Sequence, residues 1–196
     1  MKRGGRVARM RLRGHPPWPD QWKPRGFSTL HPEPSAEWWP RVSSDLGHLD
    51  PRVAEQWVHR HWSLSEYFGF ELADVRSEVR RMPTATILSE VGMVDDFRPE
   101  DREDDFEEVI RRFNPPGEPF EPAKTMNATG SWNMPILLFQ NAGGFAYDDR
   151  RTSDAHLWLL EGHLRMRYLR ALVNTGRSVA AEHEVLVLTR PDKHRK

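Results

Sequence analysis

The amino-acid sequence predicts an α+β protein, with a helical extension over about residues 50–113 and a compact α/β unit over about residues 134–190. Two observations predict this class. Apolar residues recur at helical spacing in the first region, whereas the second region reads strand, long loop, strand, helix, strand. The length of 196 residues fits one domain with an extension and a short basic tail over residues 191–196.

Composition excludes several classes of protein. The chain has no cysteine, so it carries no disulfide scaffold, no cysteine-ligated metal site and no thiol nucleophile. Its 29 basic and 29 acidic residues give a formal net charge of zero, which disfavours a protein that coats DNA. The longest clean apolar run covers residues 136–139, far short of the roughly 20 residues that span a bilayer. We therefore expect a cytoplasmic protein with no membrane partner.

Residues 1–49 are expected to form an extended, basic and Pro/Trp-rich segment. The first thirteen residues contain no acid and six basic residues, namely Lys2, Arg3, Arg6, Arg9, Arg11 and Arg13. This arm is either a solvated tail or a set of arginine contacts to the phosphates of a nucleic acid. Seven prolines between residues 15 and 40 oppose helix formation, yet the tryptophans among them are costly to leave in water. The 15–40 segment should therefore lie along a folded surface or bind a protein partner.

The region 50–133 is expected to be a helical extension. Asp50 is a good N-cap and Pro51 suits the first helical position, with Trp57 and Trp62 on the face turned inward. Further helices are expected over residues 71–81, 84–91 and 95–113, followed by a connection rich in proline and glycine. The many acids between residues 95 and 108 indicate a solvated helix face, because their spacing fits no calcium loop. No metal site is expected.

The junction between the middle strand and its helix carries the strongest functional signal. It reads Glu161, Gly162, His163, one further residue and Arg165. Glycine at such a turn lets backbone amides approach a ligand, and the start of a helix attracts anions. His163 and Arg165 would add donors for phosphate oxygens, while Glu161 would accept a proton or help hold a metal ion. In the alternative interpretation Gly162 only turns the chain, His163 caps the helix and Arg165 is solvated.

Residues 160–165 (LEGHLR) and 168–172 (YLRAL) resemble the signature of ParB/sulfiredoxin-fold domains. The resemblance covers about residues 134–190 and implies a small mixed sheet with packed helices. It also implies a nucleotide ligand, CTP or ATP with or without Mg²⁺, bound by Gly162, His163 and Arg165. Glu161 and His163 are the catalytic residues that it implies. Sulfiredoxin chemistry is excluded, because its signature needs a cysteine.

Three classes of function remain open. The first is a nucleotide- or phosphate-binding protein with phosphoryl-transfer or nucleotide-hydrolysing activity at the 161–165 loop. The second is a nucleic-acid-associated protein, DNA-binding or a ParB-like nuclease, that uses the basic arm and the helix face formed by Arg165, Arg167 and Arg170. The third is a non-catalytic scaffold that docks through the Trp/Pro-rich 15–40 segment.

Other candidate side chains carry weaker signals. Ser131 and Ser153 lack the context of a nucleophile elbow, which argues against a serine hydrolase. His183 lies between Glu182 and Glu184, and strand alternation would place it on the side opposite to these acids. A structural role is favoured for this group, and a catalytic role for His183 stays open as the alternative.

Overall fold

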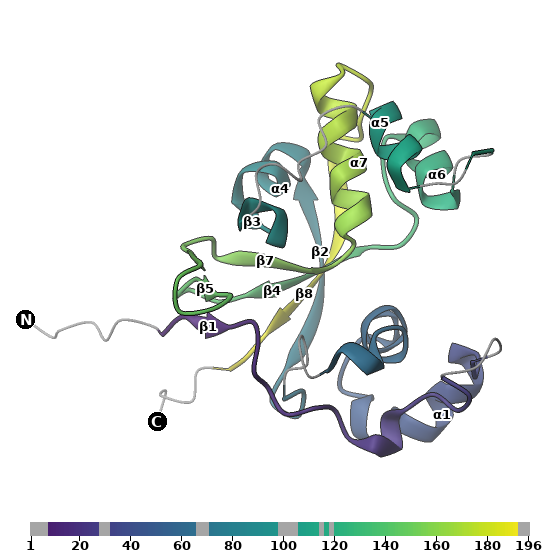
Figure 1. Ribbon diagram of the computed structural model, residues 1–196, viewed down its shortest axis with the longest axis vertical. Coiled ribbons are helices and arrows are strands. Elements are labelled where there is room, and N and C mark those ends of the chain that lie inside the picture. Colours follow the sequence, from purple (N-terminus) through teal and green to yellow (C-terminus); the bar gives the residue numbers. More distant parts are fainter. Residues whose placement is uncertain are drawn as a thin grey trace, which may run out of the picture. The chain divides into compact units, whose positions relative to one another are not determined.

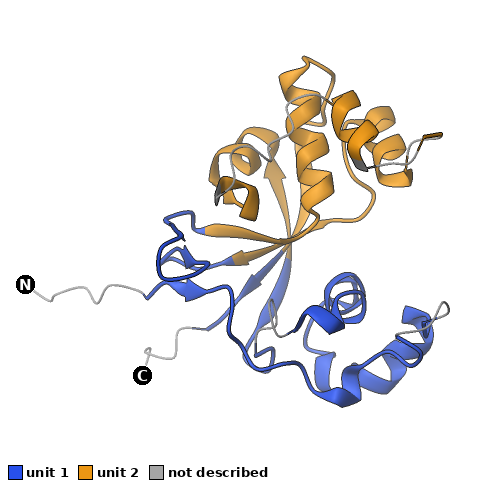
Figure 2. Ribbon diagram, in the orientation of Figure 1, with its two compact units in different colours: residues 1–78, 140–156, 187–196 blue, residues 79–139, 157–186 orange. Residues whose placement is uncertain are grey.

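The computed structural model of the chain describes residues 8–27, 32–65, 71–97, 106–113, 116–117 and 120–191. The chain divides into two compact units, drawn in blue and orange in Figure 2. Unit 1 comprises residues 1–78, 140–156 and 187–196, and unit 2 comprises residues 79–139 and 157–186. Each unit is assembled from separate stretches of the chain.

The protein is mixed α+β, and its described residues form two sheets (Figure 1). The larger has the strand order β2-β8-β4-β7-β3, and its strands are β2 (Arg76–Pro83), β3 (Val91–Gly92), β4 (Ile136–Gln140), β7 (Leu157–Glu161) and β8 (Glu182–Thr189). Strands β3 and β7 pair in parallel, with Val91 opposite Leu157. The strands predicted over residues 136–139, 157–160 and 185–188 are confirmed, with β4 between β8 and β7.

The helices of unit 2 are α4 (Thr84–Glu90), α5 (Phe106–Phe113), α6 (Glu121–Thr129) and α7 (His163–Asn174), and a 3-10 turn, η4, covers Val94–Phe97. Helix α7 packs against α5 and α6 (Figure 1). The ring of Phe106 on α5 meets the ring of Tyr168 on α7 edge-on, with the ring centroids 5.3 Å apart. The helices predicted over residues 84–91 and 164–174 are confirmed. Helix α6 lies in the stretch expected to be an irregular connection.

The helix predicted over residues 71–81 is wrong, because residues 76–83 form strand β2. The prediction relied on a stripe of four apolar residues, and one of these, Val79, is 46% exposed. Pairing of β2 with β8 in the sheet supplies backbone hydrogen bonds that local helical spacing does not reveal. The region 50–133 is therefore not a purely helical extension.

Unit 1 contains helices α1 (Ser35–Leu46) and α2 (Pro51–Val53), the π-helical turn η2 (Ala54–His59), the 3-10 turns η1 (Asp20–Trp22) and η3 (Trp62–Leu64), and the strands β1 (Met10–Arg11), β5 (Phe145–Ala146) and β6 (Thr152–Ser153). The three strands form the second sheet, in which β1 is parallel and β6 antiparallel to β5. The predicted cap of α2 is confirmed, because the Asp50 carboxylate accepts the backbone N–H of Arg52 at 2.9 Å.

The tryptophans of the 15–40 segment form the core of unit 1. Trp18, Trp22 and Trp38 are at most 9% exposed, and Trp18 packs edge-on against Trp57 with the ring centroids 5.2 Å apart. Their burial accounts for the apolar surface without a protein partner, and the expected lack of helix is wrong for α1, which continues through Pro40. Trp62, expected to turn inward with Trp57, is only half-buried.

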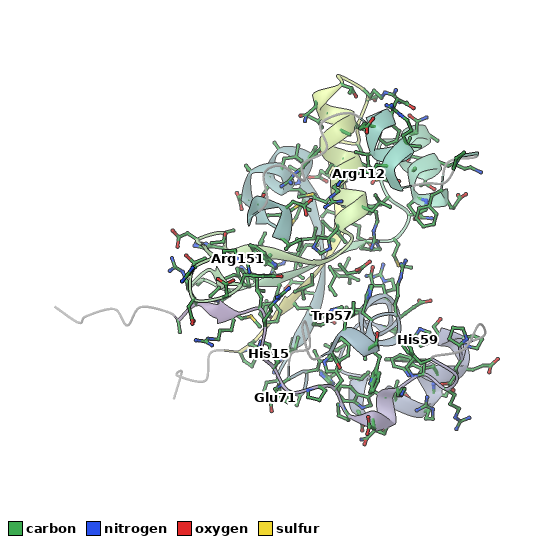
Figure 3. All side chains as sticks on the ribbon, in the orientation of Figure 1. His15, Trp57, His59, Glu71, Arg112 and Arg151 are labelled. Carbon is green, nitrogen blue, oxygen red and sulfur yellow. The ribbon has the colours of Figure 1, made fainter. Side chains whose placement is uncertain are left out.

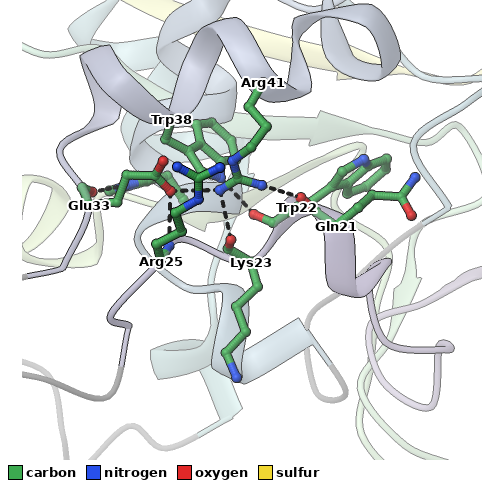
Figure 4. A network of polar contacts seen from close by, with 8 residues as sticks. Gln21, Trp22, Lys23, Arg25, Glu33, Trp38 and Arg41 are labelled. Atoms are coloured by element: carbon green, nitrogen blue, oxygen red, sulfur yellow. Dashed lines mark hydrogen bonds and ion pairs between the residues drawn. The ribbon is translucent and has the colours of Figure 1, made fainter.

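Polar contacts fix this segment to α1 (Figure 4). The Arg41 guanidinium donates to the carbonyl oxygens of Gln21 and Lys23 and to the Glu33 carboxylate, the last at 2.6 Å. Burial opposes ionisation of Glu33, but hydrogen bonds from the Arg41 side chain and the Arg25 backbone keep its pKa below the ordinary value. His59, labelled with Trp57 in Figure 3, donates through Nε2 to the Glu33 carbonyl oxygen at 2.8 Å.

Candidate functional site

The turn between β7 and α7 requires a glycine. Gly162 has a φ of 101°, and a Cβ at this position would lie 2.7 Å from Cγ2 of Ile136 on β4. Both the left-handed backbone and the close approach exclude a larger residue. Gly162 therefore fixes the direction in which α7 leaves the sheet.

The start of α7 is suited to an anion. No side chain caps this terminus, its first turn carries no acidic residue, and the first intrahelical bond runs from the Met166 N–H to the Gly162 carbonyl oxygen. The amides of a first helical turn point along the axis, and the helix dipole adds partial positive charge there. His163, the first residue of the helix, is half-buried.

Arg165 has an internal role that the spacing did not predict. Arg165 is 8% exposed. Its Nη1 donates to the carbonyl oxygens of Met134 at 2.5 Å and Pro135 at 3.0 Å. Its Nη2 lies 3.5 Å from Oε1 of Glu161, whose side chain is 16% exposed. The guanidinium thus holds the chain before β4 against the start of α7. The interpretation of Arg165 as a solvated residue is therefore wrong. Its guanidinium donates to carbonyl oxygens of the protein.

Acidic side chains after β3 neutralise the basic face of α7. Arg167 binds Asp95 with two hydrogen bonds, Nε to Oδ2 at 2.6 Å and Nη2 to Oδ1 at 2.9 Å, and Asp95 is 2% exposed. Arg170 lies 3.6 Å from Asp96. Sequence reasoning assigned Asp95 and Asp96 to a solvated helix face, and assigned Arg167 and Arg170 to nucleic acid. The structure pairs these four residues with one another.

The arginines of the N-terminal arm meet the loop that holds β5 and β6. Arg9 forms an ion pair with Asp154, and Nη2 of Arg11 lies 3.3 Å from Asp149. The guanidinium of Arg13 stacks 3.9 Å above the ring of Tyr147. Arg3 and Arg6 lie outside the described residues. Two of the three described arginines are therefore matched by carboxylates of unit 1.

A second group of side chains surrounds His183 in unit 2, and sequence reasoning considered His183 and Ser131 only separately. His183 is 1% exposed; its Nδ1 lies 2.9 Å from Oγ of Ser131 and its Nε2 lies 2.9 Å from Oγ1 of Thr84. The ring of Trp132 lies against the imidazole, with the ring centroids 4.5 Å apart and the ring planes inclined by 31°. No short-range signal could find this group, because its members come from three distant parts of the chain.

We expect His183 to make the stability of the protein pH-dependent. Burial among the neutral side chains of Ser131, Thr84 and Trp132 lowers the pKa of His183 below its ordinary value of 6.5. As the pH falls through 6.5, the unfolded chain binds a proton that folded His183 does not, so the free energy of unfolding decreases. Urea unfolding between pH 7.5 and 5.5 measures this slope. His183→Asn should have a shallower slope, and equal slopes would contradict the assignment.

The part of the chain that the structure describes contains no group of three or more His, Asp or Glu side chains placed to hold a metal ion. None of its helices combines the length and apolar character needed to cross a membrane. No protein-family model, curated protein or solved structure matches the chain.

Proposed function

We propose that this protein binds a phosphate-bearing ligand, a nucleotide such as CTP or ATP, at the start of α7. The observation that carries the proposal is the uncapped first turn of α7 directly after Gly162. This turn follows the C-terminal end of β7, which runs parallel to β3, and open α/β sheets bind ligands at that end of their strands. The resemblance of residues 160–172 to ParB/sulfiredoxin-fold domains supports the same ligand class.

The proposal divides the roles of the loop residues. The amides of the first turn and the imidazole of His163 would contact the phosphate oxygens, which are the acceptors that helix starts favour. Arg165 would act as a positioning residue, because its donors are directed at Met134 and Pro135. A phosphoryl-transfer or hydrolytic step would use Glu161 as proton acceptor and His163 as proton donor.

We expect CTP or ATP to raise the melting temperature of the full chain. A ligand at 100 times its dissociation constant adds about 2.7 kcal/mol to the free energy of unfolding. Thermal shift with each nucleotide and with inorganic phosphate, in the presence and absence of Mg²⁺, measures the effect. His163→Ala should reduce it several-fold by removing one phosphate contact.

His156→Ala is the matched control, because His156 is an exposed histidine just before β7 and should leave the shift unchanged. The absence of any shift at millimolar nucleotide would overturn the proposal. An equal loss in both histidine variants would contradict the position of the site.

The nucleic-acid alternative has less support in the described residues. Arg165, Arg167 and Arg170 bind carbonyl or carboxylate oxygens of unit 2. Arg9 and Arg11 pair with acids of unit 1. We therefore propose no nucleic-acid function. The scaffold alternative loses its docking segment, since the tryptophans of residues 15–40 are largely buried in their own unit.

A further inference from the structure

The hydrogen bonds around His183 determine which ring nitrogen carries the proton. The hydroxyl of Thr84 donates to the Ala180 carbonyl oxygen at 2.5 Å, so its oxygen is left to accept from His183. Nε2 of His183 therefore bears the hydrogen that points at Thr84. Nδ1 is then the unprotonated nitrogen, and it accepts the hydroxyl hydrogen of Ser131. The chain of bonds runs in one direction from Ser131 to Ala180.

Further contacts surround this arrangement. The Trp132 ring lies against the imidazole, and its own Nε1 donates to the Glu184 carbonyl oxygen at 2.7 Å. Gly130, with a φ of 67°, fixes the turn that presents Ser131, and its carbonyl oxygen accepts the Ala180 N–H at 3.1 Å. Ser131 is half-buried, whereas His183 is 1% exposed. The base is thus shielded from water, and the serine retains exposure to solvent.

We infer that Ser131 is a nucleophile activated by His183, with Thr84 as the positioning residue, and that it accepts an acyl group from an ester. A hydroxyl bonded to an unprotonated imidazole whose second nitrogen is held by a third group is the arrangement that activates catalytic serines. It departs from the sequence-based argument against a serine hydrolase, which considered only the local context of Ser131 and not its contact with His183. This inference concerns a different set of residues from the proposed nucleotide site and stands independently of it.

The reaction balances with water as the only co-reactant. Oγ of Ser131 attacks the ester carbonyl carbon while its proton passes to Nδ1 of His183. The bond from carbon to the leaving oxygen breaks, and that oxygen takes the proton from Nδ1 to leave as an alcohol. Water then attacks the acyl-serine with its proton passing to Nδ1, and Ser131 regains its hydrogen as the carboxylic acid leaves.

A fluorophosphonate probe tests the nucleophile directly, because displacement of fluoride by an activated serine leaves a covalent adduct on Oγ. We expect peptide mapping of the full chain to find the adduct on Ser131, and Ser131→Ala to lose it. His183→Asn should slow labelling by about 100-fold or more, the contribution of a general base. Thr84→Val, which removes only the hydroxyl that fixes the tautomer, should slow it to a smaller extent.

Ser153→Ala is the control, since Ser153 is a half-buried serine whose hydroxyl oxygen accepts the backbone N–H of Ala155, and its loss should leave labelling unchanged. Melting curves identify variants that remain folded. Labelling of Ser131 no faster than labelling of Ser153 would overturn the inference. So would an undiminished rate in folded Thr84→Val or His183→Asn, because His183 would then be only a structural bridge.

Discussion

Replacing Asp95 by alanine is expected to lower the free energy of unfolding by about 3–5 kcal/mol, the effect of removing one partner of a buried ion pair. The side chain of Asp95 is 3% exposed and that of Arg167 is 17% exposed. Without the carboxylate, the Arg167 guanidinium loses both of its short hydrogen bonds to Asp95 in a place where water has little access. Urea unfolding of the variant measures the loss.

Two further variants test whether the effect of Asp95 comes from the burial of its ion pair with Arg167. Asp95→Leu combined with Arg167→Met should recover most of the lost stability, because well-packed apolar side chains replace buried ion pairs with little penalty. Glu108→Ala removes the partner of Arg111 in an exposed pair on α5, whose side chains are 49% and 73% exposed, and should cost less than about 1 kcal/mol. A loss for Asp95→Ala as small as that for Glu108→Ala would contradict the assignment.

The region around α7 could be predicted from sequence because its local signals agree. The residues of β4 form a continuous apolar run and its first four residues are at most 1% exposed, as expected of a strand covered on both faces. Gly162 and Gly176 both have positive φ values and lie just outside the two ends of α7. Strand, turn and helix are thus each specified by residues within the segment itself.

Strand β2 and the segment before α1 could not be predicted in this way. Apolar residues spaced at three and four positions fit a helix, but the conformation of β2 is decided by its pairing with β8, about 100 residues further along the chain. The prolines of residues 15–40 indicated extended structure, and α1 nevertheless continues through Pro40 because Trp38 and Val42 are buried beside it. Tertiary packing outweighs local preference at both places.

The two candidate sites also differ in how far their residues could be predicted from the sequence. The 161–165 loop is contiguous, so its residues could be named from sequence, although the carbonyl partners of Arg165 precede a different strand. Ser131 and His183 are 52 residues apart, and Thr84 is 99 residues from His183. Only the folded sheet and helices bring them to hydrogen-bonding distance.

Gly130→Ala is expected to lower the free energy of unfolding of the protein by roughly 2–5 kcal/mol. Its φ of 67° costs an L-residue about 1–2 kcal/mol, and an added Cβ would overpack the turn at about 1–3 kcal/mol. That Cβ would lie 2.6 Å from Cα of Val179 and 2.8 Å from both the Ala180 nitrogen and the Ser178 carbonyl oxygen. All three are backbone atoms, so no side-chain rotation relieves the contact.

Gly176→Ala provides the matched comparison, because Gly176 follows α7 with a φ of 69° and a Cβ added there would meet no atom within 4 Å. This substitution should lower the free energy of unfolding only by the cost of the left-handed backbone, about 1–2 kcal/mol.

Since Gly130 joins the Ser131 turn to Ala180, whose carbonyl oxygen accepts from Thr84, Gly130→Ala should also slow fluorophosphonate labelling of Ser131. Gly176→Ala should leave the labelling rate unchanged. Equal losses of stability in the two variants would contradict the close approach at Gly130, and unchanged labelling in folded Gly130→Ala would show that the turn does not position Ser131.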